Sequence, residues 1–393
     1  MEQDSSRELS YVVVNPHTIY KSRTGGIISR LLTRTTLDLV GGIVLAPSRE
    51  FVDEFAATIV TDQAPAHREV QEQIRRYVLD HYAPEASGLR QRIMVFLFQG
   101  PDAVRRTREA VGTIRGRSIG GGETIRDTYG DLVLNRDGSV RYFEPAVLCA
   151  PTVADARRQL EILARHADAD GGLSGNVLPT QGRPDHQRTL VILKPDNFRF
   201  PSGRPGNVID LFAKAGLSIT ALKVHRLCVT EAERFYGPVR PVLLNAFHGP
   251  TGQRAKELLQ SAIAIPITAE TQAKLGDLLG PLAAEEQFQN LIRFMTGRAP
   301  RDCPDAEKDE PGSEKCILLV YEGIDAVRRI REVLGPTDPA KAPPGSIRRE
   351  FGQTIMVNAA HASDSPENAA RELDIVKIRE NNFKSLIRQA AGL

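Results

Sequence analysis

An internal repeat constrains the fold of this 393-residue chain more than any other feature of its sequence. Three segments recur in the same order in the two halves. They are Tyr11-Val-Val-Val-Asn-Pro-His17 with Leu190-Val-Ile-Leu-Lys-Pro-Asp196, residues 95–104 with 318–327, and Glu123-Thr-Ile-Arg126 with Gly345-Ser-Ile-Arg348. Ordered self-similarity of this kind indicates a duplicated structural unit. We therefore expect each half to fold into a version of one architecture.

The order of elements within each half predicts the fold class. Short apolar runs that suit buried strands alternate with stretches of helical period, giving strand, helix, strand, helix and then the same again. This order favours an α+β fold with helices packed on a mainly antiparallel sheet. We expect two ferredoxin-like α/β sandwich domains.

A polar, glycine-rich stretch divides the chain. Residues 168–187 contain little that could be buried and several residues that interrupt helices and strands. The preceding residues 153–167 have apolar side chains at helical spacing and would close a first domain. The predicted division is therefore a domain at 1–167, a linker at 168–187 and a second domain at 188–393.

Composition excludes several classes of protein. The 41% of hydrophobic residues argue against wholesale disorder, and 51 Lys and Arg against 49 Asp and Glu leave no global field that favours nucleic acid. The longest apolar runs are far shorter than the roughly 20 residues of a membrane span. Residues 1–6 lack the features of a secretory signal, so we expect a cytoplasmic protein. Four scattered cysteines without a Cys-x-x-Cys pair indicate reduced thiols.

One histidine stands at a place suited to chemistry. The sequence predicts a strand at 355–360 and a helix that begins with Ser365 as N-cap and Pro366 in the first turn. His361 would then lie on the turn between them, with Glu372 on the helix able to orient its ring. Taken alone, the pattern suits an ordinary structural or surface histidine as well as a nucleophile.

Three further positions suit phosphate binding. Arg331 and Thr337 flank a Leu-Gly-Pro turn, and Arg348 follows a Pro-Pro-Gly-Ser loop. Guanidinium groups and hydroxyls are good partners for phosphate oxygens. Lys194 ends a predicted strand, where its charge could point into a cleft. Arg331 fits a solvated helix face equally well, and Lys194 fits an ordinary strand end.

Together these segments resemble the nucleoside diphosphate kinase family. The segments that carry the resemblance lie in family order between residue 189 and about residue 380. They are Leu-Lys194-Pro-Asp, Val320-Tyr-Glu-Gly, Leu-Gly-Pro-Thr337-Asp-Pro, Pro-Gly-Ser-Ile-Arg348 and Asn358-Ala-Ala-His361-Ala-Ser-Asp-Ser. The resemblance implies that His361 takes the γ-phosphate of a nucleoside triphosphate and passes it to a nucleoside diphosphate.

The same resemblance implies roles for other residues. Glu372 and Ser363 match the residues that hold the imidazole, and Tyr236 would lie beside the histidine. Contacts to phosphate or ribose are implied for Lys194, Arg331, Thr337, Arg348 and Asn358. The family usually adds Mg²⁺ on the phosphates of the nucleotide, which no protein carboxylate cluster need hold. Family members also assemble, so we expect self-association.

The second half departs from the family in three respects. The family usually stacks a phenylalanine on the base. The nearest candidates are Gln287 and Phe288, which follow a long insertion at about 237–286. A second polar insertion covers 298–314. Ala362 stands where a glycine commonly follows the histidine.

The first half resembles the same family but lacks the residues to which the resemblance assigns its chemistry. Asn15 stands where Lys194 stands, Ile114 where Thr337 stands and Cys149 where His361 stands, whereas Arg108 and Arg126 persist. We expect a structural pseudo-subunit that packs against the second half. The interval from Arg126 to Cys149 is about ten residues longer than its counterpart, which predicts a hairpin turning at Asn135-Arg-Asp-Gly138.

Two other functions compete with a kinase. Both halves could bind nucleotides or partners in a regulatory or scaffold protein without turnover, which the near-complete residue set of the second half disfavours. Nucleic-acid binding rests only on the arginine-rich stretches 105–117 and 328–331, which have no interleaved aromatics.

Overall fold

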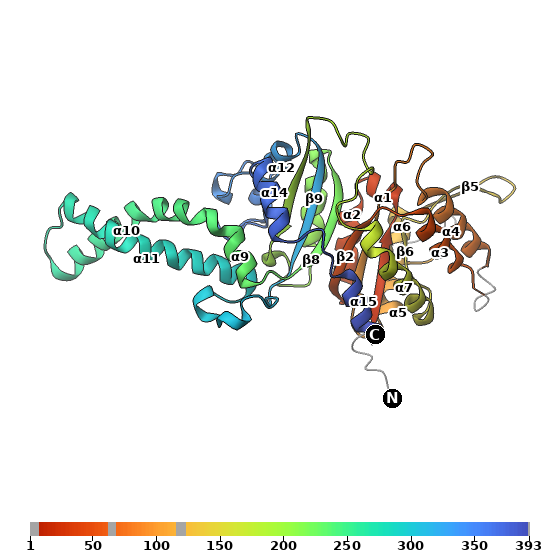
Figure 1. Ribbon diagram of the computed structural model, residues 1–393, viewed down its shortest axis with the longest axis horizontal. Helices are drawn as coiled ribbons and strands as arrows, with labels where there is room; N and C mark the ends of the chain where they lie inside the picture. The colour runs from red at the N-terminus through yellow and green to blue at the C-terminus, as the bar shows by residue number, and fades with distance from the viewer. Residues whose placement is uncertain (1–7, 62–67, 115–122, 392–393) are drawn as a thin grey trace. The chain divides into compact units, whose positions relative to one another are not determined.

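The computed structural model describes residues 8–61, 68–114 and 123–391 (Figure 1). The N-terminal residues 1–6 and the end of the stretch 105–117 lie outside the described residues. The chain forms two compact units. One combines the residues up to His225 with those from Ile317 onward, and the other comprises Arg226–Cys316.

The first half builds a four-stranded sheet whose neighbouring strands are antiparallel, in the order β2-β3-β1-β6. Its strands are β1 (Leu9–Val14), β2 (Asp38–Leu45), β3 (Ile93–Gln99) and β6 (Val147–Leu148). The helices are α1 (Pro16–Tyr20), α2 (Thr24–Arg34), α3 (Arg49–Ala57), α4 (Arg68–His81), α5 (Ala103–Val111), α6 (Ile125–Tyr129) and α7 (Val153–Asp170). The six residues of β1 are all buried because helices cover both faces of the sheet.

The hairpin predicted in the first half is confirmed. Strands β4 (Asp131–Leu134) and β5 (Val140–Glu144) pair antiparallel. Asn135 donates its backbone N–H to the carbonyl of Ser139 at 2.8 Å, and Gly138 has a φ of +83° in the turn. A positive φ is the conformation that glycine adopts at least cost.

The second half repeats the sheet in the order β10-β7-β9-β8. Its strands are β7 (His186–Leu193), β8 (Ser218–His225), β9 (Cys316–Ile324) and β10 (Ala360–Ala362). The α-helices are α8 (Arg204–Phe212), α12 (Ala326–Leu334), α13 (Ile347–Phe351), α14 (Pro366–Ile375) and α15 (Phe383–Ala391), and short 3₁₀ turns cover Pro195–Asn197, Ala213–Ala215 and Pro339–Lys341. The two sheets share one strand order, which confirms the predicted α+β fold with two ferredoxin-like sandwiches.

The repeat extends to single backbone conformations. Asp102 and Asp325 precede α5 and α12 with φ values of 54° and 53°, and Ala146 and Ala359 precede β6 and β10 with values of 59° and 70°. Non-glycine residues seldom adopt this left-handed conformation, which costs on the order of 1 kcal/mol. Matched strained residues give a structural alignment of the halves that does not depend on sequence similarity.

The two halves share one hydrophobic core within the first unit. Apolar residues from both sheets belong to it, among them Val14 and Phe96 from the first half and Leu193 and Leu319 from the second. Helices α2 and α8 cross with almost no space between their backbones, since a Cβ atom on Gly206 would lie 2.1 Å from the carbonyl oxygen of Gly25.

The C-terminal helix packs on the half to which it does not belong in sequence. Phe383 and Ile387 of α15 are buried in the same core as Phe51 and Leu160 of the first half, and Figure 1 shows α15 beside α7. Lys384 Nζ donates to Asp168 Oδ2 at 2.6 Å. Helix α15 therefore completes the core on the outer face of the first sheet.

The predicted linker is bonded to both halves. Helix α7 runs to Asp170 and β7 begins at His186, so the connecting segment is shorter than predicted. Asn176 Nδ2 donates to the carbonyl of Gly88 at 2.7 Å, and Gln181 Nε2 donates to Glu322 Oε2 at 3.1 Å. The division into a domain 1–167 and a domain 188–393 stays a prediction.

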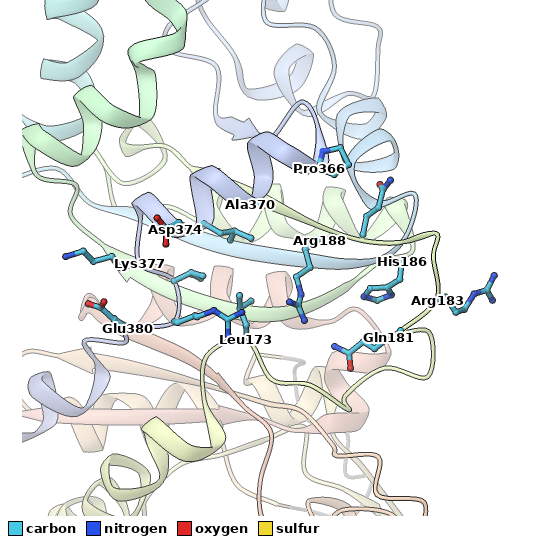
Figure 2. A pocket seen from close by; sticks show the side chains of 15 residues that line it. Leu173, Gln181, Arg183, His186, Arg188, Pro366, Ala370, Asp374, Lys377 and Glu380 are labelled. Atoms are coloured by element: carbon cyan, nitrogen blue, oxygen red, sulfur yellow. The ribbon is translucent and has the colours of Figure 1, made fainter.

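A hollow of about 670 Å³ lies between this connector and α14 (Figure 2). Arg188 and His186 line it from β7, and both donate to the buried carboxylate of Glu322, at 2.7 Å and 2.9 Å. Thr220 Oγ1 donates to the same carboxylate at 2.8 Å. Hydrogen bonds from these side chains thus stabilise the buried carboxylate of Glu322 next to the hollow.

The second unit is helical. It contains α9 (Val229–Tyr236), α10 (Arg240–Ile263), α11 (Ala269–Thr296) and short 3₁₀ turns at Gly237–Val239, Pro300–Asp302 and Asp305–Glu307. The long insertion predicted at 237–286 forms most of the α10–α11 hairpin, and the turns follow α11 within 298–314. Gly252 and Gly276 let the two helices approach closely. Among the described residues, none of the helices is long and apolar enough to cross a membrane.

Candidate active site

A hydrogen-bonded group on β10 and α14 orients the ring of His361. Its Nε2 lies 3.0 Å from Glu372 Oε2, and Ser363 Oγ donates to the same oxygen at 2.7 Å. Glu372 and Ser363 are buried, whereas 21% of the His361 side chain is exposed. An ionised carboxylate only accepts hydrogen bonds, so this contact places a proton on Nε2 and leaves a lone pair on Nδ1.

The predicted boundaries around His361 are partly wrong. The strand is Ala360–Ala362 and not 355–360, so His361 lies within a strand, opposite Ile192 of β7. Residues before it form a turn in which Val357 donates its N–H to Thr354 Oγ1 at 3.0 Å. The left-handed Ala359 separates this turn from the strand, because such a residue cannot continue a pleated ladder.

The start of α14 is as predicted. Ser365 Oγ accepts a hydrogen bond from the backbone N–H of Asn368 at 3.1 Å, and Pro366 occupies the first turn. The cap fixes the helix start, and Glu372 follows two turns later on the face toward β10.

Lys194 is buried beside the turn that leads to His361. Its Nζ donates to Asn358 Oδ1 at 2.6 Å and to the carbonyl of Met356 at 3.1 Å. Burial lowers the pKa of Lys194 to about 7, and the positive charge of Arg348 acts in the same direction. Asn358 Nδ2 donates to the carbonyl of Thr337 at 3.0 Å. The structure therefore brings three of the predicted site residues into one network.

Arg348 lies against the strand that carries His361. Its Nη2 donates to the carbonyl of Ala360 at 3.1 Å and its Nη1 to that of Gly335 at 3.0 Å. The side chains of Arg331 and Thr337 are exposed. Arg331 lines a shallow hollow that also includes Pro366 at the start of α14. A guanidinium group and a hydroxyl are thus open to solvent on this side of the second half.

Three supporting residues were missed by the sequence analysis. Asp196 Oδ2 accepts hydrogen bonds from Arg204 Nη2 at 2.6 Å and from the N–H of Ala359 at 3.3 Å, and burial raises the pKa of Asp196. Asn197 Nδ2 donates to the carbonyl of Ala359 at 2.7 Å. These contacts hold Ala359 in its left-handed conformation. The sequence could have indicated Asp196 and Asn197, because they are polar residues that closely follow a buried strand.

Two predicted site residues belong to the helical unit. Tyr236 ends α9, is buried, and contacts the ring of Phe235 with centroids 4.9 Å apart. Phe288 on α11 is 1% exposed, and the guanidinium of Arg240 lies 3.8 Å from its ring centroid. Their predicted roles beside the histidine and against a base stay predictions.

Comparisons with known proteins identify the family. A family model described as nucleoside diphosphate kinase matches residues 262–381. The nucleoside diphosphate kinase of Chlamydia abortus is 31% identical over 188 residues, which cover 48% of this chain and 90% of that protein. The chain belongs to the nucleoside diphosphate kinase family. The enzyme of Staphylothermus marinus is 30% identical over 190 residues, or 92% of its length. A crystal structure of an NDP kinase from Pyrobaculum aerophilum matches 48% of this chain at 30% identity with a TM-score of 0.31.

These relatives of the nucleoside diphosphate kinase family cover about half of the chain. The correspondence between residues of the two halves therefore follows from the structure and not from these relatives. The pairing of strand residues within each sheet shows that Leu148, and not Cys149, occupies the position of His361. Val13 pairs with Leu148 in the first half, as the equivalent Ile192 pairs with His361 in the second. Sequence similarity aligned Cys149 with His361, one residue away from the structural match, because the left-handed conformation shared by Ala146 and Ala359 leaves no sequence motif.

In the first half, Leu148 and Asn15 occupy the positions of His361 and Lys194. Leu148 is buried in a hydrophobic core, and Asn15 accepts a hydrogen bond from Tyr82 Oη at 2.6 Å. Arg126 keeps the contacts of Arg348, with donations to the carbonyls of Gly112 at 2.8 Å and Val147 at 3.1 Å. Because these arginine contacts persist without a histidine, they contribute to the architecture of both halves.

Proposed function

We propose that this chain is a nucleoside diphosphate kinase that transfers the γ-phosphate of a nucleoside triphosphate to a nucleoside diphosphate through phosphorylated His361. The observation that supports this most strongly is the contact of His361 Nε2 with Glu372, which Ser363 shares. It gives a partly exposed imidazole a fixed orientation and a lone pair on Nδ1. A histidine with a structural role alone has no need of both features.

The transfer has two steps. His361 Nδ1 attacks the γ-phosphorus, a nitrogen–phosphorus bond forms, and the bond between the γ-phosphorus and the bridging oxygen breaks so that the diphosphate leaves. A second nucleoside diphosphate then attacks the phosphohistidine with a terminal oxygen, and the N–P bond breaks. Glu372 stabilises the ring while it carries additional positive charge.

The cationic residues near His361 fit a phosphate chain. The positive charge of Arg348 lowers the pKa of Lys194, and both side chains donate to the segment 356–360. Phosphoryl transfer depends on positioning and on spread positive charge. We assign Lys194 and Arg348 to phosphate contacts, Arg331 and Thr337 to the exposed end of the phosphate chain, and Asn358 to positioning Lys194 and the ribose side.

A divalent cation fits this site as part of the nucleotide. Among the described residues, no three His, Cys, Asp or Glu side chains are grouped so that they could hold a metal ion. Mg²⁺ on the phosphates would neutralise charge and leave the cationic side chains to contact the remaining oxygens. We further propose that the first half serves as a pseudo-subunit and that the chain can self-associate, and we keep Tyr236 beside the histidine and Phe288 as the residue that stacks on the base.

A coupled assay of ATP-dependent GDP phosphorylation tests the function. We expect turnover with ping-pong kinetics in the wild-type chain and none above background in His361→Asn. Binding of ATP without turnover by the purified wild-type chain would contradict the proposal and favour a regulatory nucleotide-binding protein.

A further inference from the structure

The helical hairpin of the second unit carries most of the large apolar side chains that are exposed. Among the described residues, 14 such side chains are exposed, and eight of them lie on α10, on α11 or on the loop between the two helices. These eight are Val242, Leu244, Leu258, Leu259, Ile263, Ile265, Leu278 and Leu282. Single exposed apolar side chains are ordinary, whereas a cluster of them indicates a surface that binds a partner.

The contact between the two helices defines which side of the hairpin is open. Helices α10 and α11 lie side by side as an antiparallel pair, with Gly252 against Gly276 and His248 against Gly280 (Figure 1). Residues 251 and 275 each directly precede one of these contact glycines. Because successive residues of a helix are about 100° apart, both positions lie to the side of the contact. A two-fold rotation exchanges the helices of an antiparallel pair and keeps each face in place, so both positions share one face of the hairpin.

An apolar stripe continues along this face on both helices. The stripe consists of Leu244, Thr251 and Leu258 on α10 and of Leu275, Leu278 and Leu282 on α11. The members on α10 recur every seven residues, and those on α11 are spaced by three and by four. These spacings are typical of helices that pack against further helices. Leu258, Leu278 and Leu282 are 61%, 68% and 66% exposed, so within one chain the stripe is not covered.

The charge of the hairpin favours an identical partner. The two helices contain five basic residues, Arg240, Arg254, Lys256, Lys274 and Arg293, and five acidic residues, Glu257, Glu270, Asp277, Glu285 and Glu286. A surface that binds anionic lipid or nucleic acid carries an excess of Lys and Arg, which this hairpin lacks. A hairpin without net charge can lie against its own copy without electrostatic repulsion.

The size of the face matches a stable protein–protein interface. At 1.5 Å per residue, the 28 residues of α11 extend about 42 Å, and two helices of about 10 Å diameter lying side by side present a face of roughly 800 Å². A standard interface buries about 800 Å² on each partner. Two identical faces of this size can close on each other around a two-fold axis.

We propose that the apolar face of the α10–α11 hairpin binds the same face of a second copy of this chain, so that two hairpins form a four-helix bundle. The leucines of each stripe then pack between the helices of the other copy, as core positions do in such bundles. This contact assigns a surface to the proposed self-association. It does not depend on nucleotide transfer, so a wild type that forms this dimer without turnover would contradict the proposed kinase activity alone.

Analytical ultracentrifugation of the full chain over a dilution series tests the proposal. We expect a reversible dimer for the wild type. Leu278→Glu combined with Leu282→Glu should raise the dissociation constant of the dimer by at least tenfold, because the new carboxylates would be buried in the interface without partners. Leu134→Glu is the matched control, since it changes an exposed leucine of the first half, and should dimerise like the wild type.

Helix content, measured by circular dichroism, shows whether the double variant keeps its fold, which we expect because both leucines are exposed. Leu258→Glu on α10 is an independent variant of the same face and should also weaken the dimer. A monomeric wild type would overturn the proposal, as would unchanged dimerisation in both the double variant and Leu258→Glu. Binding of the wild type to vesicles of phosphatidylcholine and phosphatidylserine that is lost in the double variant would assign the face to a membrane and overturn the proposal as well.

Discussion

Glu372 determines which nitrogen of His361 carries the proton. The carboxylate accepts from Nε2 and from the Ser363 hydroxyl, so in the proposed transfer Nδ1 is the nitrogen that would attack phosphorus. The position of the proton on Nε2 is inferred from its hydrogen-bond partner, because an ionised carboxylate can only accept a hydrogen bond.

Glu372→Gln should reduce the turnover number of nucleotide transfer by about tenfold to a hundredfold, because a hydrogen bond to a charged group is worth about 1.5–3 kcal/mol. Ser363→Ala is the matched comparison and should cost less, since the charge remains. Steady-state rates from the coupled assay measure both. A larger loss for Ser363→Ala than for Glu372→Gln would contradict the assigned roles.

The pKa of Lys194 predicts proton uptake on nucleotide binding. With a pKa of about 7 in the folded chain, against an ordinary value of 10.5, Lys194 is mainly neutral at pH 8.5. Phosphate groups close to Nζ favour the charged form, so ADP binding at this pH should take up close to one proton per site. Below pH 7 the lysine is already charged, and the uptake should decline.

Titration calorimetry in buffers of different ionisation enthalpy measures this uptake. Lys194→Met should abolish it. The same shift predicts that the free energy of unfolding rises with pH between about 7 and 10.5, since in that window the unfolded chain binds more protons. A binding enthalpy at pH 8.5 that is the same in all buffers would argue against a phosphate near Lys194.

At the scale of elements, the crossing of α2 and α8 depends on glycine. A Cβ atom on Gly206 would lie 2.1 Å from the carbonyl oxygen of Gly25, and backbone atoms cannot move away without separating the helices. Gly206→Ala should therefore lower the free energy of unfolding by about 1–3 kcal/mol or more, which is typical of overpacking. Gly175→Ala is the control, because nothing lies within 4 Å of the new Cβ. Equal denaturant midpoints for the two variants would show that the crossing tolerates a side chain.

The sequence predicted those elements whose signals are local. The hairpin at 135–138 and the cap at Ser365 follow from turn and capping residues within a few positions. The strand at 355–360 was misplaced because Asp196 and Asn197, far away in sequence, hold Ala359 in a left-handed conformation. Ala146 has the same left-handed conformation as Ala359. Because the sequence does not reveal this conformation, Cys149 was aligned with His361 in place of Leu148. Long-range contacts of this kind leave no periodic pattern.

At the scale of the molecule, the two halves depend on each other. Helix α15 covers the outer face of the first sheet, although it lies at the C-terminal end of the chain. The sequence could show that this helix is amphipathic, but not which sheet it covers, because both halves offer apolar faces. The relation between the halves therefore required the structure.

The mutual packing predicts the behaviour of fragments. Residues 188–393 without the first half should be less stable and less soluble than the full chain, because α8 and α15 lose their partners. Residues 1–167 should show no nucleotide transfer. Solubility and thermal unfolding midpoints measure the first effect and the coupled assay the second. Cys149→Ser in the full chain is the control and should leave turnover unchanged, and transfer by the purified first half would contradict the account.

The most direct test of the central claim is the isolation of a phosphoenzyme. Incubation of the full chain with γ-labelled ATP and Mg²⁺ should label His361, and the label should be lost in acid, retained in base, and transferred to added GDP. His361→Asn should not be labelled. A label that survives acid, or that persists in His361→Asn, would contradict a phosphohistidine mechanism for this chain.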